Sequence, residues 1–341
     1  MPLISVVLPV YNVETYISDA ITSVLNQTIQ DFEIIVIDDC STDNTLSVVK
    51  SFEDSRIRII EKPKNKGLID SLNMGFSEAE GQFIARMDGD DINVLNRFEK
   101  QLKILQNRPD IKACGCWLQC FGASSKIIKH KREHEQIQAQ LLLGNPMSLG
   151  ATMLNREAYK AYNFDASKEH AEDYDFWARS AWDCKMYNIQ EVLYHYRTHQ
   201  DQVSSLYNDI QKNQDIGIKL SLYHKIGYDK TEFSDAFLKK MLFSNEQISI
   251  TDCKQFFKWL SQISRVNKKQ QIFGHKELLD VVEQLKRKFV FDIFFTNNRE
   301  GIHYETRKQI LGVLPFKQKL FIVRKKLKER VSLLRKREVT G

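Results

Sequence analysis

Three carboxylates stand within four residues, directly after a short and mostly apolar run of the chain. The run Phe83–Met87 has the composition of a buried strand, and Asp88, Asp90 and Asp91 follow it without a spacer. Carboxylates this close repel one another unless a cation or hydrogen-bond donors lie among them. Mg²⁺ and similar hard cations prefer oxygen ligands and share one or two carboxylates with substrate phosphates. The cluster therefore predicts a metal held against a diphosphate. A solvated acidic loop, the usual form of a charge run, fits poorly after a buried strand.

The first 110 residues alternate between two kinds of pattern, which must position this cluster. Apolar runs of β-type residues predict strands at Ile4–Pro9, Phe32–Ile37, Arg56–Ile60 and Phe83–Met87. Helical spacing predicts helices over residues 14–27, around Leu46–Phe52 with Ser41 or Thr42 as the N-cap, and around Ile69–Ala79. This alternation is typical of a parallel sheet covered on both faces, whose ligands bind outside the carboxyl ends of the strands. Asp38-Asp39 and the acidic cluster both lie at such ends.

The pattern changes along the rest of the chain. Shorter strands and a helix at about 173–183 are expected up to residue 200, and helical spacing dominates from about 205 to 290. We therefore predict an α/β domain over residues 1–205, a helical appendage over 206–300 and a basic amphipathic tail over 301–341.

The formal charge of +6 is concentrated at the C-terminus. Residues 302–341 hold twelve Lys or Arg against three Asp or Glu, so the other residues carry a net charge of −3. No stretch approaches the roughly 20 apolar residues of a membrane-spanning helix, and the N-terminus lacks the pattern of a secretory signal. The six cysteines are too few and too scattered for a disulfide framework. These features favour a cytoplasmic protein with reduced thiols.

A series of short motifs resembles glycosyltransferase family 2 in order and spacing. The motifs are Pro9-Val10-Tyr11-Asn12, Asn26-Gln27-Thr28, Asp38-Asp39-Cys40-Ser41-Thr42-Asp43, Asn65-Lys66-Gly67-Leu68, Asn73-Met74-Gly75, Asp88-Gly89-Asp90-Asp91, Glu172-Asp173-Tyr174-Asp175-Phe176-Trp177, and Tyr196-Arg197-Thr198-His199 with Gln202 and Ser204. The resemblance covers about residues 3–205. It implies the GT-A fold, a nucleotide-diphospho-sugar transferase fold with a Rossmann-like, mostly parallel sheet flanked by helices, here with a C-terminal helical extension. It also implies an inverting, nucleotide-sugar-dependent enzyme of bacterial surface polysaccharide biosynthesis.

The resemblance assigns the donor nucleotide to residues near the ends of the first strands. Asp39 would accept the N3–H of uracil, with Pro9 and Tyr11 beside the base, and Asn65 would also bind the donor. The alternative is that Asp39 only caps the helix that follows. Because hydroxyl residues are available for that cap, we favour a role for Asp39 in donor binding.

The acidic cluster is expected to face the leaving group. The resemblance implies that Asp90 ligates Mn²⁺ or Mg²⁺, while Asp88 contacts the ribose or reaches the metal through water. Gly89 would let the backbone approach the ligand without a side chain in the way. Asp91 would hold the turn.

A second segment would grip the diphosphate. Arg197 offers a planar fork for phosphate oxygens, and Ser204 belongs to the same donor-binding loop. His199 either completes the shell of the metal or serves as a simple hydrogen-bonding group.

Asp173 is the candidate base that deprotonates the acceptor hydroxyl. It stands at the start of a predicted helix, where the helix dipole stabilises an anion. Acidic residues are common in first helical turns, and only the resemblance favours Asp173 over Glu172 or Asp175. One base that assists attack opposite the leaving group gives a single displacement with inversion, as in inverting glycosidases. The expected activity is hexosyl or N-acetylhexosaminyl transfer.

The tail carries one apolar stripe between cationic side chains. The stripe consists of Phe316, Leu320, Val323, Leu327, Val331 and Leu334. Such a helix is typical of one that lies on an anionic membrane surface, which would place the protein at the inner face of the cell membrane and suit a lipid-linked glycan acceptor. Docking of the tail on the enzyme's own body is the alternative. Nucleic acid is disfavoured, because the stripe would remain in water and no recognised binding motif is present.

Other function classes fit less well. A dinucleotide-dependent oxidoreductase would need a Gly-x-Gly-x-x-Gly turn after the first strand, where the chain has Pro9-Val10-Tyr11-Asn12. A non-catalytic nucleotide-sugar-binding protein could dispense with Asp90 and Asp173, but both are present. A nucleotide-sugar hydrolase, with water as acceptor, stays open.

Overall fold

The computed structural model describes the backbone of residues 1–198, 208–296 and 304–339, and the side chains in these ranges except those of residues 208 and 329–339. The chain divides into two compact units, Met1–Lys219 and Leu220–Gly341. The predicted boundaries at residues 205 and 300 both fall outside the described residues, so that three-part division stays a prediction.

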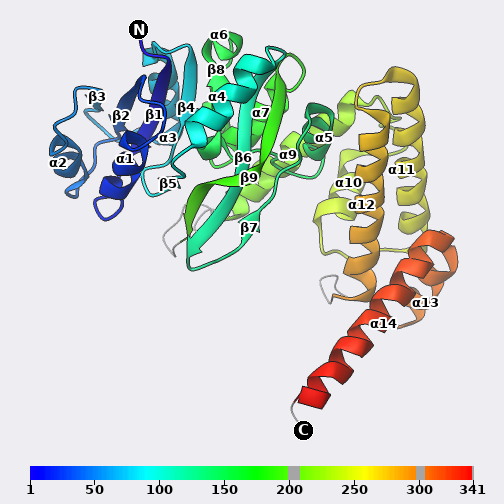
Figure 1. Ribbon diagram of the computed structural model, residues 1–341. Helices are drawn as coiled ribbons and strands as arrows, with labels where there is room; N and C mark the ends of the chain where they lie inside the picture. The colour runs from blue at the N-terminus through cyan, green and yellow to red at the C-terminus, as the bar shows by residue number, and fades with distance from the viewer. Residues whose placement is uncertain (199–207, 297–303, 340–341) are drawn as a thin grey trace. The chain divides into compact units, whose positions relative to one another are not determined.

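A nine-stranded sheet forms the centre of the first unit (Figure 1). Its strands are β1 (Ile4–Val10), β2 (Phe32–Asp38), β3 (Ile57–Glu61), β4 (Phe83–Arg86), β5 (Ile92–Asn93), β6 (Ile111–Gly122), β7 (Ile127–Ile128), β8 (Met153–Asn155) and β9 (Lys185–Thr198). They follow the order β3-β2-β1-β4-β8-β6-β9-β5, and β7 pairs with β6. The first four strands are parallel, as the alternating pattern predicts. The later strands make the sheet mixed, because β8 is antiparallel to both β4 and β6.

Helices cover both faces of the parallel strands. Those of the first unit are α1 (Ile17–Leu25), α2 (Thr45–Lys50), α3 (Leu68–Glu78), α4 (Arg97–Asn107), α5 (His134–Gln140), α6 (Arg156–Tyr159) and α7 (Glu172–Ser180), while α9 (Asn208–Lys225) runs across the division between the units. Val6 of β1 packs in one core cluster with Ile21 of α1 and Phe98 of α4. Its neighbour Val7 faces α3, where a Cβ on Gly75 would lie 2.5 Å from Val7 Cγ1. Because all seven residues of β1 are buried, this strand shows a continuous apolar run instead of alternation.

One expectation about helix α2 is wrong. Its N-cap is Asn44, and neither Ser41 nor Thr42 caps it. These hydroxyl residues instead tie their loop to the end of β1, since Ser41 Oγ accepts the Asn12 N–H at 3.1 Å and the Thr42 N–H donates to Asn12 Oδ1 at 2.8 Å. The loop after β2 is thereby fixed against the loop after β1.

The second unit is helical, as the spacing after residue 205 predicts. Its helices are α10 (Asp235–Phe243), α11 (Ile250–Gln270), α12 (His275–Phe294), α13 (Tyr304–Val313) and α14 (Phe316–Val339). Helices α11 and α12 lie side by side (Figure 1), and Phe256 and Phe289 meet between them with ring centroids 4.9 Å apart. Trp259 is fully buried beside them.

Helix α14 packs on α12 through a face that the sequence pattern does not single out. Gln318 Nε2 donates to Glu283 Oε1 at 2.8 Å, and Lys325 Nζ lies 4.4 Å from the centre of the Phe291 ring. Ile322 is buried in the same contact.

The predicted apolar stripe of α14 is left largely uncovered within this unit. Phe316, Val323 and Leu327 are 80%, 53% and 56% exposed. The side chains of Val331 and Leu334 lie outside the described residues. Docking on the protein's own body therefore does occur, but through the neighbouring face of the helix.

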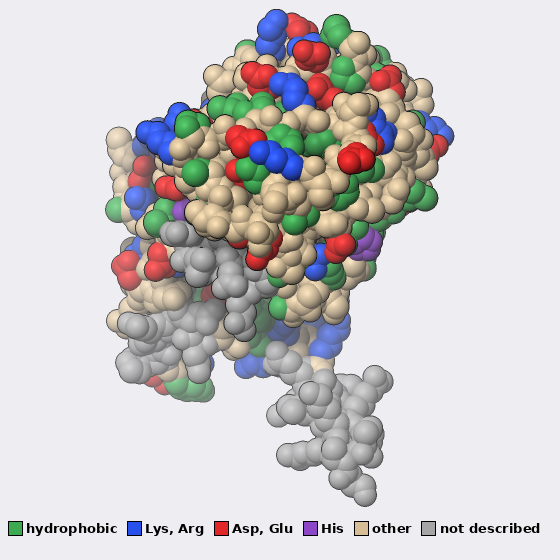
Figure 2. Space-filling view, turned by 90° about the vertical axis from the view of Figure 1, so that its left-hand side faces the viewer, with side chains coloured by type: hydrophobic (Ala, Val, Ile, Leu, Met, Phe, Trp, Pro, Cys, Tyr) green, Lys and Arg blue, Asp and Glu red, His purple; other side chains and the backbone are tan. Residues whose placement is uncertain are grey.

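The described segments contain no helix that combines the length and the apolarity needed to span a membrane. On the face shown in Figure 2, acidic and basic side chains are interspersed.

Candidate active site

The two acidic groups of the sequence meet at one edge of the sheet. Asp38 and Asp39 end β2 and the cluster Asp88–Asp91 follows β4, and both strands pair in parallel with β1 between them. The carboxyl ends of these strands therefore bring both groups together at the position where such sheets bind ligands.

Asp39 is buried and surrounded by hydrogen-bond donors. Its Oδ1 accepts the Lys66 N–H at 2.9 Å and lies 2.6 Å from Lys62 Nζ, while its Oδ2 accepts the Gly67 N–H at 2.8 Å. Asp39 thus holds the loop between β3 and α3 and does not cap α2. The sequence analysis considered donor binding or helix capping for Asp39 and did not foresee this contact with the loop. A carboxylate oxygen has two acceptor directions, so Oδ2 keeps one for a donor such as a base N–H.

Lys62 is the buried cation that neutralises the charge of Asp39. Its side chain is 1% exposed and also contacts Asp70 Oδ2 at 2.8 Å and Ser71 Oγ at 3.0 Å. The sequence analysis missed Lys62, because a lysine that follows Glu61 at the end of a strand gives no local signal of burial. The loop closes through Gly67, whose φ of +86° favours glycine.

The other residues predicted to bind the donor base lie in β1, directly after it, and in the loop between β3 and α3. Pro9 is buried within β1, and Tyr11 follows that strand with its side chain 46% exposed. Asn65 Oδ1 accepts the Gly67 N–H at 3.1 Å.

The three carboxylates after β4 are not equivalent. Asp91 is fully buried and its Oδ1 accepts the backbone N–H of Arg197 at 2.7 Å, whereas Asp88 and Asp90 remain partly exposed. Burial, together with the charges of Asp88 and Asp90, raises the pKa of Asp91 far above its usual range. Asp91 therefore joins its turn to the end of β9 and is more than a local turn residue.

The carboxylate oxygens at this turn suit a cation that also binds oxygens of a ligand. Within the described ranges, no three His, Cys, Asp or Glu side chains converge as a metal site. Two partly exposed carboxylates, Asp88 and Asp90, suit a Mg²⁺-like ion that takes its other ligands from phosphates and water. Packing also favours a glycine at position 89, since a Cβ there would lie 3.0 Å from Val10 Cγ1.

Arg197 stands against the same turn. Its guanidinium lies between the rings of Tyr16 and Phe121, at 4.3 and 4.4 Å from their centres, and its Nε donates to the carbonyl of Asp90 at 2.7 Å. The structure thus brings the end of β9 to the turn of Asp88–Asp91. His199 and Ser204 lie outside the described residues.

Asp173 lies in the first turn of α7 and is tied to a distant loop. Asn145 Nδ2 donates to its Oδ2 at 2.5 Å, and the Tyr174 N–H donates to its Oδ1 at 2.6 Å. Burial and the neighbouring Glu172 raise the pKa of Asp173 to about 7, although both hydrogen bonds oppose that rise. Such a pKa is close to that of an effective general base near neutral pH.

Comparison with known proteins identifies the family. Residues 5–170 match the family model described as Glycosyl transferase family 2. An uncharacterized glycosyltransferase of Haemophilus influenzae is 32% identical over 327 residues, which cover 85% of this chain and 97% of the relative. The chain belongs to glycosyltransferase family 2.

Two further comparisons extend this assignment. The Escherichia coli UDP-Glc:alpha-D-GlcNAc-diphosphoundecaprenol beta-1,3-glucosyltransferase WfgD is 30% identical over 217 residues, which cover 63% of this chain and 85% of the relative. A crystal structure of S. aureus TarS 1-349 in complex with UDP-GlcNAc has a TM-score of 0.54 at 17% identity, covering 78% of this chain and 83% of the other. The structural likeness shows that this family-2 glycosyltransferase has the predicted GT-A fold.

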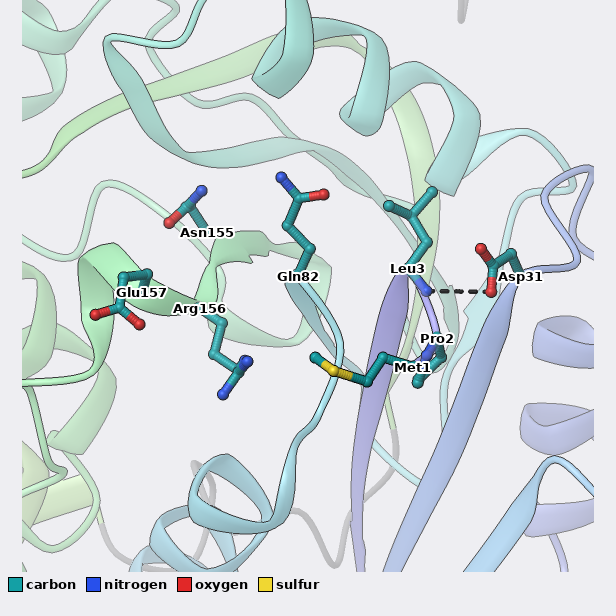
Figure 3. A pocket seen from close by; sticks show the side chains of 8 residues that line it. All are labelled: Met1, Pro2, Leu3, Asp31, Gln82, Asn155, Arg156 and Glu157. Atoms are coloured by element: carbon teal, nitrogen blue, oxygen red, sulfur yellow. Dashed lines mark hydrogen bonds between the residues drawn. The ribbon is translucent and has the colours of Figure 1, made fainter.

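A hollow elsewhere on the catalytic unit of this glycosyltransferase is separate from the acidic edge. Figure 3 shows that Leu3 and Gln82, at the amino ends of β1 and β4, line it together with Asn155 and Arg156. It therefore lies at the opposite end of the parallel strands from Asp88. Arg156 Nε is already bound to the carbonyl of Gly81 at 2.7 Å.

Proposed function

We propose that this family-2 glycosyltransferase moves a sugar from a UDP-sugar to a glycan or lipid-linked glycan, with inversion and with a divalent metal. The proposal is supported by the meeting of Asp39 with the pair Asp88 and Asp90 at one edge of the sheet, and by the raised pKa of the Asp173 carboxylate. Arg86 connects this pair with Asp173, because it contacts Asp88 and its charge acts on Asp173. Donor, leaving group and acceptor each then have a matching group.

The chemistry divides among these residues. Asp39 accepts the N3–H of uracil through Oδ2, with Pro9, Tyr11 and Asn65 around the base. Arg197 and Ser204 bind the diphosphate, and His199 either completes the metal shell or hydrogen-bonds the diphosphate.

Asp90, and Asp88 directly or through water, would hold a Mn²⁺ or Mg²⁺ ion, which would supply positive charge to the departing diphosphate. Asp173 takes the proton of the acceptor hydroxyl as its oxygen attacks the anomeric carbon. The bond from that carbon to the diphosphate oxygen breaks, and its electron pair leaves with the diphosphate. Attack opposite the leaving group inverts the anomeric centre.

The relatives support a sugar of the hexose class. The name of WfgD specifies UDP-Glc and a diphosphoundecaprenol-linked acceptor, and TarS was crystallised with UDP-GlcNAc. We propose hexosyl or N-acetylhexosaminyl transfer in the synthesis of a bacterial surface polysaccharide such as a capsule or lipopolysaccharide.

Titration calorimetry with UDP tests the site. UDP should bind tightly only with Mn²⁺ or Mg²⁺, and Asp90→Ala should remove that metal dependence. Asp173→Ala should keep UDP binding and lose transfer, and transfer retained by this variant would exclude Asp173 from the mechanism. Metal-dependent UDP binding without transfer to any glycan would favour a binding protein, and release of free sugar would favour a hydrolase.

We also propose that α14 lies on an anionic membrane surface, at the inner face of the cell membrane. The exposed Phe316, Val323 and Leu327 stand among Lys317, Lys319, Arg324, Lys326 and Lys328. An apolar strip beside cationic side chains matches a surface of acyl chains and anionic headgroups.

Sedimentation with vesicles of anionic lipid tests this placement. The double variant Val323→Gln/Leu327→Gln should lose binding, whereas Leu311→Gln, at an exposed apolar residue of α13 outside the stripe, should retain it. Equal binding by both variants would contradict the membrane proposal.

A further inference from the structure

Arg86 is a buried arginine at the end of β4 that the sequence analysis did not single out. It is 5% exposed, and its backbone is fixed on both sides. Its N–H donates to the Thr152 carbonyl at 3.0 Å, and its own carbonyl accepts from Arg97 Nη2 at 2.9 Å. The strand therefore places the guanidinium with little freedom.

One side of the guanidinium holds Asp88. Arg86 Nη1 donates to Asp88 Oδ2 in a close ion pair, and Tyr194 Oη accepts the Asp88 N–H at 3.1 Å. The backbone of Gly150 lies directly on this pair, since a Cβ there would be 2.5 Å from Asp88 Oδ2 and 2.7 Å from Arg86 Nη1. Only glycine leaves the pair undisturbed at this position.

The charge of Arg86 also acts on the first turn of α7. The positive charge of Arg86 lowers the pKa values of both Glu172 and Asp173, which burial raises. Arg86 Nε is buried and has no hydrogen-bond partner among the described residues. The charged or titratable groups that face Arg86 are Asp88, Asp91, Tyr194, Arg97, Glu172 and Asp173.

We propose that Arg86 is a positioning residue for transfer, which fixes the direction of the Asp88 carboxylate at the end of β4. This inference rests on the proposed function of the site. Without a cation beside it, the Asp88 carboxylate would be repelled by Asp90 and Asp91 and would turn away from them. A guanidinium is always charged and has five donors in a rigid fork, so it can hold Asp88 in one direction. Lysine would supply the charge without the fork.

Steady-state transfer and UDP calorimetry with Mn²⁺ test the proposal on the full chain. Arg86→Met should lower kcat on the order of 100-fold, as expected when catalytic groups lose their alignment, and should move the acid limb of the pH–rate profile to higher pH. Arg86→Lys should restore the position of the limb but only part of kcat. Unchanged kcat and an unchanged limb in Arg86→Met would overturn the proposal.

A second variant keeps the test decisive if Arg86→Met does not fold. Gly150→Ala should press on the pair and lower kcat, while Gly217→Ala, where no atom lies within 4 Å of an added Cβ, should transfer like the parent. Equal kcat values for these two glycine variants would overturn the proposal. Asp173→Asn separates the two hypotheses. If it retains transfer, the proposed function fails, and if it alone abolishes transfer, only the role of Arg86 fails.

Discussion

The pKa of the proposed base gives the sharpest prediction. A pKa of about 7 for Asp173 means that about one molecule in eleven carries the ionised base at pH 6, against about ten in eleven at pH 8. Because the acceptor proton moves to the ionised carboxylate, kcat/KM should fall about tenfold for each unit of pH below 7. Two residues next to Asp173 should shift the midpoint of this acid limb of the pH–rate profile in opposite directions.

Glu172→Gln and Asn145→Ala are the two perturbations. Glu172 raises the pKa of Asp173 and Asn145 lowers it, so the glutamine variant should move the acid limb to lower pH and the alanine variant to higher pH. Asn163→Ala, at an exposed asparagine that precedes α7, is the matched control and should leave the limb in place. The plateau of kcat/KM should also fall in Asn145→Ala, since Asn145 Nδ2 orients the carboxylate from 2.5 Å, but the diagnostic quantity is the midpoint of the limb.

The assay is kcat/KM from pH 5 to pH 9, with buffers of constant ionic strength, because this ratio reports the pKa values of the free enzyme. A limb that stays at one pH in both variants, or that moves in the same direction in both, would refute the assignment of Asp173 as the base. Retention of the limb in Asp173→Asn would refute it as well.

Three further outcomes follow from the same contacts. Lys62→Met removes the buried cation that contacts Asp39 and Asp70. It should lower the free energy of unfolding, measured in urea, by about 3–5 kcal/mol. Lys64→Met, at an exposed lysine, should change it little. Gly67→Ala meets no atom within 4 Å, so its cost, about 1–3 kcal/mol, should come from the positive φ alone, and UDP binding should weaken with it. Asp173→Asn should raise the melting temperature progressively from about pH 4 to pH 7 and by a constant amount above. The reason is that a carboxyl with a raised folded pKa loses stability as pH rises through that range.

The sequence sufficed for the elements and for the main groups of the site. Continuous apolar runs and helical spacing are local properties, and they predicted β1, β2, β4, α1 and α3 to within a few residues. The rule that parallel strands bring their carboxyl ends to one edge then placed Asp39 beside the Asp88–Asp91 turn. The family motifs added Asp173, which no local pattern separates from Glu172.

Only the tertiary structure decided how each polar group is partnered. Asp91 and Asp90 are neighbours in one turn, yet one is fully buried against Arg197, 106 residues away, and the other is partly exposed. The ion pair between Arg86 and Asp88 likewise lies against the backbone of Gly150, which no short-range pattern links to β4.

The same distinction holds for the C-terminal helix. For α14, the sequence identified a helix with an apolar stripe, but the structure buries Gln318 and Ile322 on the neighbouring face and leaves Val323 exposed. Periodicity determines which side of a helix or strand is apolar, because that depends on the element alone. Which partner covers that side, and which carboxylate loses its water, depends on residues far away in the chain, so only the folded structure could decide it.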